Sequence, residues 1–159
     1  MPSSQQLTLG RSFALVFDHG EDFFPTLTDF CATHNIRQGY IPMFIAGFAT
    51  VDIVGTCDKL DNPQAPVWTK VHLTNVEAVG AGTIAWNPAT DSISPHIHVA
   101  VGLKELSAQG YTSHLLDARV QFLVEMIITE VAEPSMHRLP NPALYDAPQL
   151  RLGPPTPEA

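Results

Sequence analysis

One main segment of this 159-residue chain carries apolar residues at helical spacing, and that restricts the fold more than any other feature. The residues at this spacing are Phe23, Leu27, Phe30 and Cys31. The segment follows Glu21 and Asp22, whose negative charges favour the positive end of a helix dipole. It ends near His34, before Asn35, a residue that tolerates left-handed backbone. We therefore expect one main helix over about residues 20–34.

Most of the remaining chain consists of short runs of β-branched and aromatic residues, which are typical of strands. Residues 11–18 are apolar on both faces, which predicts a central strand covered on both sides. Residues 118–131 are long enough for a helix, but their β-branched content favours a strand. Further strands are expected over 39–46, 48–56, 68–73, 76–86, 93–103 and 111–116, with a loop over 58–66 and a turn over 87–91. The sequence therefore predicts an α+β fold, a mostly antiparallel sheet of about seven strands with one main helix packed on it.

Two histidines separated by one residue mark the strand expected over 93–103. In a strand, His96 and His98 point to the same side, with Cα atoms about 6.6 Å apart. That spacing lets both imidazoles reach one ion, and His114 on the next strand could complete a three-histidine face. Three nitrogen ligands would leave one position open, as in catalytic zinc sites. The alternative is a polar pair of histidines that faces solvent and binds no metal.

The turn over 87–91 suggests a register for the two strands that it joins. If it is the whole loop, Trp86 faces Ser92, and Gly82 then faces His96. By the same count Gly80 faces His98, and these glycines would leave a pit beside the metal for a ligand. This register places Glu77 on the opposite face, which makes it a poor ligand candidate. A slip by one residue reverses that conclusion.

Several segments together resemble one known family. They are Phe13–Asp22, Ile45–Ala49, the glutamate and glycine segment Val76–Thr83, the His96-Ile97-His98 strand, and Gly110–Leu116 with its His114-Leu115 pair. In this order they resemble the plants-and-prokaryotes-conserved (PPC) domain, which in land plants follows an AT-hook in nuclear DNA-binding proteins. The likeness covers about residues 11–131. Thr112-Ser113 departs from the family's two glycines before the third histidine, and Val76 is smaller than the usual residue before the glutamate.

The resemblance implies a stand-alone prokaryotic member that forms a trimer. It also implies a divalent metal held by His96, His98 and His114, and this donor set favours zinc, although nickel, copper or iron would also fit. Glu77, Gly47 and Gly82 are residues of the family pattern with no known role.

Charge argues against simple DNA binding. Eight Lys and Arg stand against sixteen Asp and Glu, for a formal net charge of −8. No two basic residues are adjacent, and the chain lacks the Arg-Gly-Arg-Pro core of an AT-hook. Proteins that grip phosphates need clustered cations, so DNA is a possible partner that the charge does not support.

The expected organisation is a leader over 1–10, a PPC-type domain over 11–132 and a C-terminal arm over 133–159. The arm holds seven of the fourteen prolines together with several leucines, so we expect it to pack on its own domain or on a neighbouring subunit. Cys31 lies on the apolar face of the expected helix, which predicts a buried, reduced thiol. The polar N-terminus and the lack of a membrane-spanning apolar run lead us to expect a cytoplasmic protein without membrane contact.

Three functions stay open at this point. The first is a homotrimeric module that binds a divalent metal and has an open site for a small ligand. The second is a DNA-binding or transcription-associated protein, and the third is an oligomerisation scaffold. Neither a Ser-His-Asp set nor a pair of catalytic carboxylates can be assigned, so the sequence leaves enzymatic activity open.

Overall fold

The computed structural model describes residues 3–55, 70–144 and 146–154. In chain order its elements are β1 (Thr8–Asp18), α1 (Phe23–Thr33), β2 (Gly39–Val54), β3 (Lys70–Asn87), β4 (Ser92–Leu103), η1 (Lys104–Leu106), β5 (Gly110–Glu133), β6 (Met136–Asn141), η2 (Pro142–Leu144) and β7 (Ala147–Leu152). Over these ranges the seven strands form one sheet that is antiparallel except where β3 meets β6. The predicted α+β class with a mostly antiparallel sheet and one helix is confirmed. The expected loop over 58–66, Thr56, Trp68 and Cys57 lie outside the described residues.

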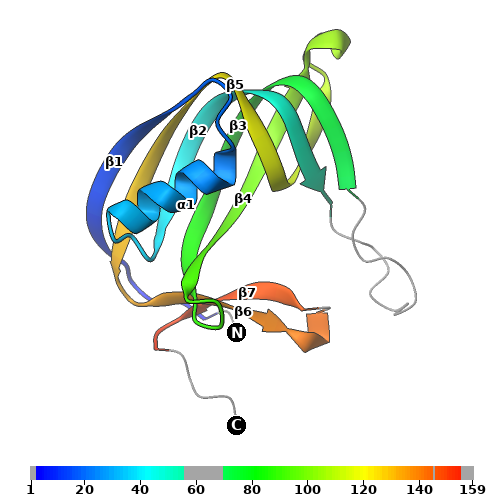
Figure 1. Cartoon of the computed structure of the whole chain (residues 1–159). Coiled ribbons are helices and arrows are strands. Elements are labelled where there is room, and N and C mark those ends of the chain that lie inside the picture. Colours follow the sequence, from blue (N-terminus) through cyan, green and yellow to red (C-terminus); the bar gives the residue numbers. More distant parts are fainter. Residues whose placement is uncertain (1–2, 56–69, 145, 155–159) are drawn as a thin grey trace.

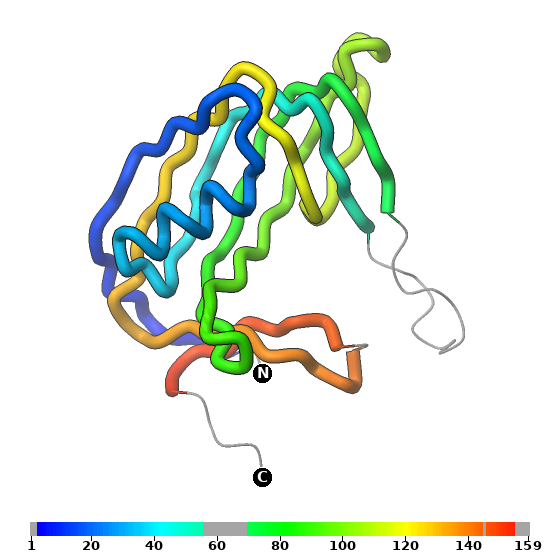
Figure 2. The backbone as a smooth tube through the Cα atoms, in the orientation of Figure 1, coloured from blue at the N-terminus to red at the C-terminus, as the bar shows by residue number. Residues whose placement is uncertain are grey.

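Four strands close into a ring, which makes the fold a small barrel (Figure 1). Strand β2 pairs with β3 and β5, and β4 also pairs with β3 and β5, so each of the four has two neighbours. Strand β1 extends this ring from β5. The hairpin of β6 and β7 joins it through a parallel contact between Trp86 and His137. In the tube view this hairpin lies beside the turn that connects β3 and β4 (Figure 2).

Three strand breaks that the sequence predicted do not occur. β2 runs through Gly47, β3 runs through Asn75, and β5 runs through Asp117. The irregularities lie inside the strands: the β2–β5 register shifts between Ala46 and Phe48, across Gly47, and Asn75 of β3 has a φ of 53°. Pro42 lies in a second register shift of β2, as a residue without a backbone N–H requires. A bulge bends a strand without ending its hydrogen-bonded ladder, so each pair of predicted strands forms one longer strand. The number of strands still agrees with the prediction because β6 and β7, which were not predicted, add two.

Helix α1 covers one face of the sheet (Figure 1). Its buried side chains, Phe23 among them, join the hydrophobic core with that face. Phe23 is fully buried, and its ring lies 5.4–5.8 Å from the rings of Phe17, Phe44 and Phe48. Cys31 is a free, buried cysteine, as predicted, and burial raises the pKa of its thiol to about 11. Asn35 ends the helix with a φ of 55°. Among the residues that the structure describes, each helix is too short or too polar to span a lipid bilayer.

Strand β1 is an edge strand, so the prediction of a central strand is wrong, and one of its two faces is open in the single chain. It pairs only with β5, and Leu15 and Phe17 face the core. Ala14 and Val16 point the other way, and Val16 is 68% exposed. The apolar residues on both faces therefore reflect one core face and one open apolar face of the single chain.

Candidate metal centre

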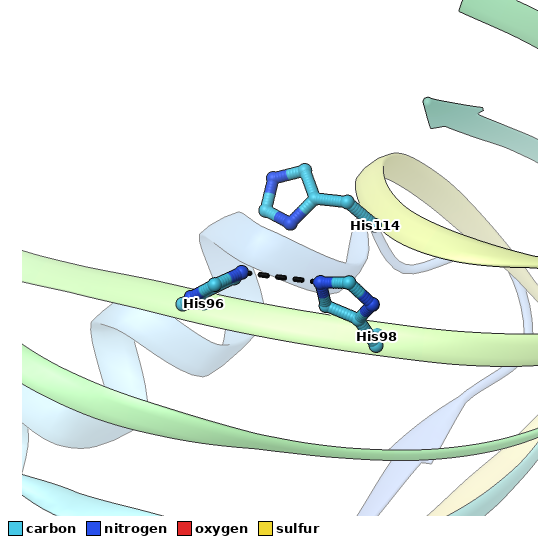
Figure 3. A group of neighbouring side chains, drawn as sticks. All are labelled: His96, His98 and His114. Atoms are coloured by element: carbon cyan, nitrogen blue, oxygen red, sulfur yellow. Dashed lines mark hydrogen bonds between the residues drawn. The ribbon is translucent and has the colours of Figure 1, made fainter. Parts of the chain in front are cut away.

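The three histidines predicted as ligands lie together on the outer face of the ring (Figure 3). His96 and His98 alternate with the buried Ile97 of β4, so both leave the strand on the side away from the core. His114 stands directly opposite His98 in the β4–β5 pairing and therefore shares its face. One ring nitrogen from each histidine lies within 4.8 Å of the other two. The structure therefore brings together the three histidines that the sequence predicted as a group.

The arrangement of nitrogens fits a small cation. Nε2 of His96 lies 3.2 Å from Nε2 of His98, and two ligands on a tetrahedral zinc ion lie about 3.4 Å apart. Nδ1 of His114 is buried and has no hydrogen-bond partner. An unpaired buried nitrogen is costly to leave unsatisfied, and a bound cation would satisfy it.

Burial keeps the rings of His96 and His114 neutral, as metal ligation requires. Desolvation, followed by the charge of Arg138, lowers the pKa of His96 to about 4. Desolvation also lowers the pKa of His114, with His98 the next cause. Both imidazoles are therefore neutral near pH 7, and a neutral imidazole has the lone pair that ligation needs.

An arginine from the C-terminal hairpin adjoins the three histidines. Arg138 of β6 is only 4% exposed. Its Nη2 donates to Oγ1 of Thr83 at 2.8 Å, and its Nη1 donates to Nδ1 of His96 at 3.3 Å. Thr83 is paired directly with His96 across β3 and β4, which explains why one guanidinium reaches both. Sequence reasoning missed Arg138, because a single basic residue among prolines gives no local signal of where it will fold.

The contact with Arg138 fixes the tautomer of His96. A guanidinium only donates, so Nδ1 of His96 must accept, and the ring proton of the neutral imidazole is then on Nε2. That proton accounts for the hydrogen bond from Nε2 of His96 to Nε2 of His98. Nε2 of His96 can ligate a cation only after its proton moves to Nδ1, where it would oppose the N–H of Arg138.

The predicted β3–β4 register is wrong by one residue. His98 faces Ala81 and His96 faces Thr83, because Asn87 pairs with Ser92 and only four residues form the turn. The side-chain amide of Asn87 accepts from the backbone N–H of Ala89, and this contact keeps Asn87 at the end of the ladder.

The glycines therefore face the core rather than a ligand pit. A Cβ on Gly80 would lie 2.3 Å from the ring of Phe44, and one on Gly82 would lie 2.8 Å from the side chain of Ile97. These glycines make room for the core side chains Phe44 and Ile97 on the inner face.

Glu77 lies on the same face as the histidines, so the argument that placed it on the other face is wrong. It pairs with Gly102 of β4 and with Gly47 of β2, four residues along β4 from the row of His98. The group of possible ligands does not include it. Gly47 and Glu77 line a surface hollow of about 300 Å³ that is separate from the histidines.

The other four histidines have different surroundings. His19 accepts from the backbone N–H of Phe122, and the Nδ1 of His34 lies 3.0 Å from the carbonyl oxygen of Phe30. His72 contacts Asp52 at 2.6 Å, and His137 is buried in β6. His19 and His72 are therefore suitable matched controls for substitutions in the cluster.

Comparison with known proteins relates most of the chain to one family. The family model described as the Plants and Prokaryotes Conserved (PCC) domain matches residues 4–132. A search of the curated proteins found no match to the sequence.

Solved structures share the fold at low sequence identity. A metal-containing protein from Archaeoglobus fulgidus has a TM-score of 0.75 and 19% identity, over 90% of this chain and 95% of that one. A plant- and prokaryote-conserved protein from Pyrococcus horikoshii has a TM-score of 0.76 and 19% identity, over 89% and 93%. A candidate DNA-binding protein from Ralstonia eutropha has a TM-score of 0.71 and 21% identity, over 87% and 90%.

Proposed function

The chain belongs to the Plants and Prokaryotes Conserved domain family, and from this premise we propose that it is a module that binds a divalent metal. His96, His98 and His114 are the ligands, and one coordination position is open to a small ligand. The observation that carries the proposal is the convergence of three imidazole nitrogens within 4.8 Å on one face of β4 and β5. A similar fold in a protein described as metal-containing supports it.

Zinc is the metal that this donor set favours. Three imidazoles are borderline ligands that suit zinc, and zinc accepts a tetrahedral site with an open position. A bound zinc ion would act as a Lewis acid toward whatever occupies that position. The chain's own contribution is to hold three imidazoles together on the neighbouring strands β4 and β5.

Elemental analysis and metal titration test the assignment. The purified chain should bind one equivalent of zinc, and His98→Ala should weaken binding at least about a hundredfold, since it removes a direct ligand. His19→Ala and His72→Ala should leave the affinity within about twofold. Stoichiometric zinc in a variant that lacks both His96 and His98 would overturn the proposal.

We further propose that the protein is a homotrimer, as the family resemblance implies. Three exposed apolar side chains lie in one row across the open face, since Val79 pairs with Ile45, and Glu125 lies between Ile45 and Val16 and pairs with both. Val79 is 56% exposed in the single chain, and burying such a row between copies is favourable. Sedimentation should give a trimer at micromolar concentration, and Val79→Asp should dissociate it. A stable wild-type monomer would refute this part.

DNA binding is the second candidate, because a neighbour of similar fold is described as a candidate DNA-binding protein. The net charge of −8 opposes it, since affinity for duplex DNA depends on clustered cations. We expect no measurable duplex binding at physiological ionic strength. A sequence-selective complex that survives this salt would make DNA binding the leading function.

A further inference from the structure

The environment of Arg138 identifies a class of ligand for the histidine site. Its guanidinium is buried, yet its Nε has no hydrogen-bond partner. The two groups to which it donates, Oγ1 of Thr83 and Nδ1 of His96, carry no negative charge. A guanidinium stays charged near neutral pH.

This cation has no counter-ion within the described part of the chain. Ion pairs there join Arg11 to Glu130, and Lys70 and His72 to Asp52. None involves Arg138, although the chain holds twice as many acidic as basic residues. A buried charge is costly unless it is paired, so an unpaired guanidinium beside three imidazoles marks a place where an anion would be stabilised.

Metal binding to the three histidines would increase the tendency of Arg138 to attract an anion. Once Nε2 of His96 presents its lone pair, Nδ1 carries the proton and no longer accepts from Nη1 of Arg138. The guanidinium then retains only Thr83 as a partner, next to a site of higher positive charge. An anion that reaches the open position could accept from the freed N–H groups.

We propose that Arg138 is the anion-binding residue of this site and that the site takes a small carboxylate, held between the open metal position and the guanidinium. This inference rests on the proposed function. A carboxylate fits because its two oxygens match the planar fork of one arginine. A phosphate carries more charge, and among the described residues Arg138 is the only arginine or lysine that is hydrogen-bonded to one of the three histidines.

The test uses the full chain loaded with cobalt(II), whose visible absorption reports changes in its ligands. Acetate should change the wild-type spectrum to saturation. Arg138→Met should raise the apparent dissociation constant for acetate at least tenfold without weakening cobalt binding, because it removes a positive charge beside the metal. Arg11→Met, a matched change at a paired arginine, should leave the acetate constant within twofold. Chloride should lose less affinity than acetate in Arg138→Met, since it feels the charge of the guanidinium but cannot use the fork.

Each negative result of this experiment leads to a different conclusion. If cobalt does not bind to the histidines, the proposed function and this inference both fall. If cobalt binds but acetate binds wild type and Arg138→Met equally, only this inference falls. Inorganic phosphate that binds tenfold more tightly than acetate would overturn the carboxylate class. If Arg138→Met does not fold, Arg138→Lys keeps the charge and stem but loses the fork, and it should still raise the acetate constant about threefold or more; an unchanged constant would overturn the proposal.

Discussion

Residues that alternate along β4 have different roles: those on one face pack in the core, and those on the other face form the histidine site. Ile97, Val99 and Val101 point inward and are at most 4% exposed. His96 and His98, which alternate with them, point outward to His114 and Arg138. The inward face removes apolar surface from water, whereas the outward face collects groups that would each prefer water or a partner. The core face therefore supplies the stability that lets the site face hold unpaired polar groups.

The largest expected effect is on the core face. Phe44 is fully buried against Phe23, and Phe44→Ala should lower the free energy of unfolding by about 3–5 kcal/mol, from lost transfer energy and the cavity left behind. Urea denaturation at one protein concentration measures the loss. Metal affinity of the remaining folded protein should be unchanged, and a large fall in affinity would show that the two faces are not independent.

Gly80 tests the boundary between the two faces. A Cβ there would lie 2.3 Å from the Phe44 ring and 2.8 Å from the carbonyl oxygen of His98. Gly80→Ala should therefore overpack the core and destabilise the fold by about 1–3 kcal/mol. Ala81→Ser, on the outward face beside His98, is the control and should be nearly neutral. A fully stable Gly80→Ala protein would show that Phe44 can move aside at little cost.

The sequence predicted the site better than its surroundings. The ligand candidates followed from alternation in a strand, which depends only on neighbouring residues, and His114 followed from the expected next strand and the family pattern. The register failed because one residue, Asn87, belongs to the ladder rather than to the turn. Arg138 could not be predicted, because its place depends on how a hairpin 40 residues further along docks on β3. Alternation within a strand can be predicted from neighbouring residues, whereas the docking of a distant segment depends on the packing of the whole fold.

Acid should lower the free energy of unfolding through protonation of His96 on the site face, whereas the apolar core face has no group that titrates. In metal-free protein the pKa of His96 is about 4, below its ordinary 6.5, so between these values the unfolded chain binds the extra proton. Stability should fall as the pH is lowered through this window, by about 1–2 kcal/mol because the ring is only partly buried. Unfolding in urea with a chelator present, at pH 7.5, 5.5 and 4.5, measures this. His96→Gln, which does not titrate, should lose less stability over the same range. Parallel pH profiles for wild type and His96→Gln would contradict the assignment of this loss to His96.

The smallest effect on stability is expected at Arg11, which has the carboxylate partner that Arg138 lacks. Arg11 donates from Nε and its terminal nitrogen to both carboxylate oxygens of Glu130, at 2.8 and 3.0 Å, and it lies at the surface. Exposed ion pairs contribute little, because water solvates both charges nearly as well when they are apart. Arg11→Gln should leave the urea midpoint unchanged within error, at low and at high salt. A salt-dependent loss as large as that of Gly80→Ala would show that this pair holds β1 to β5, and that a paired surface arginine can matter as much as core packing.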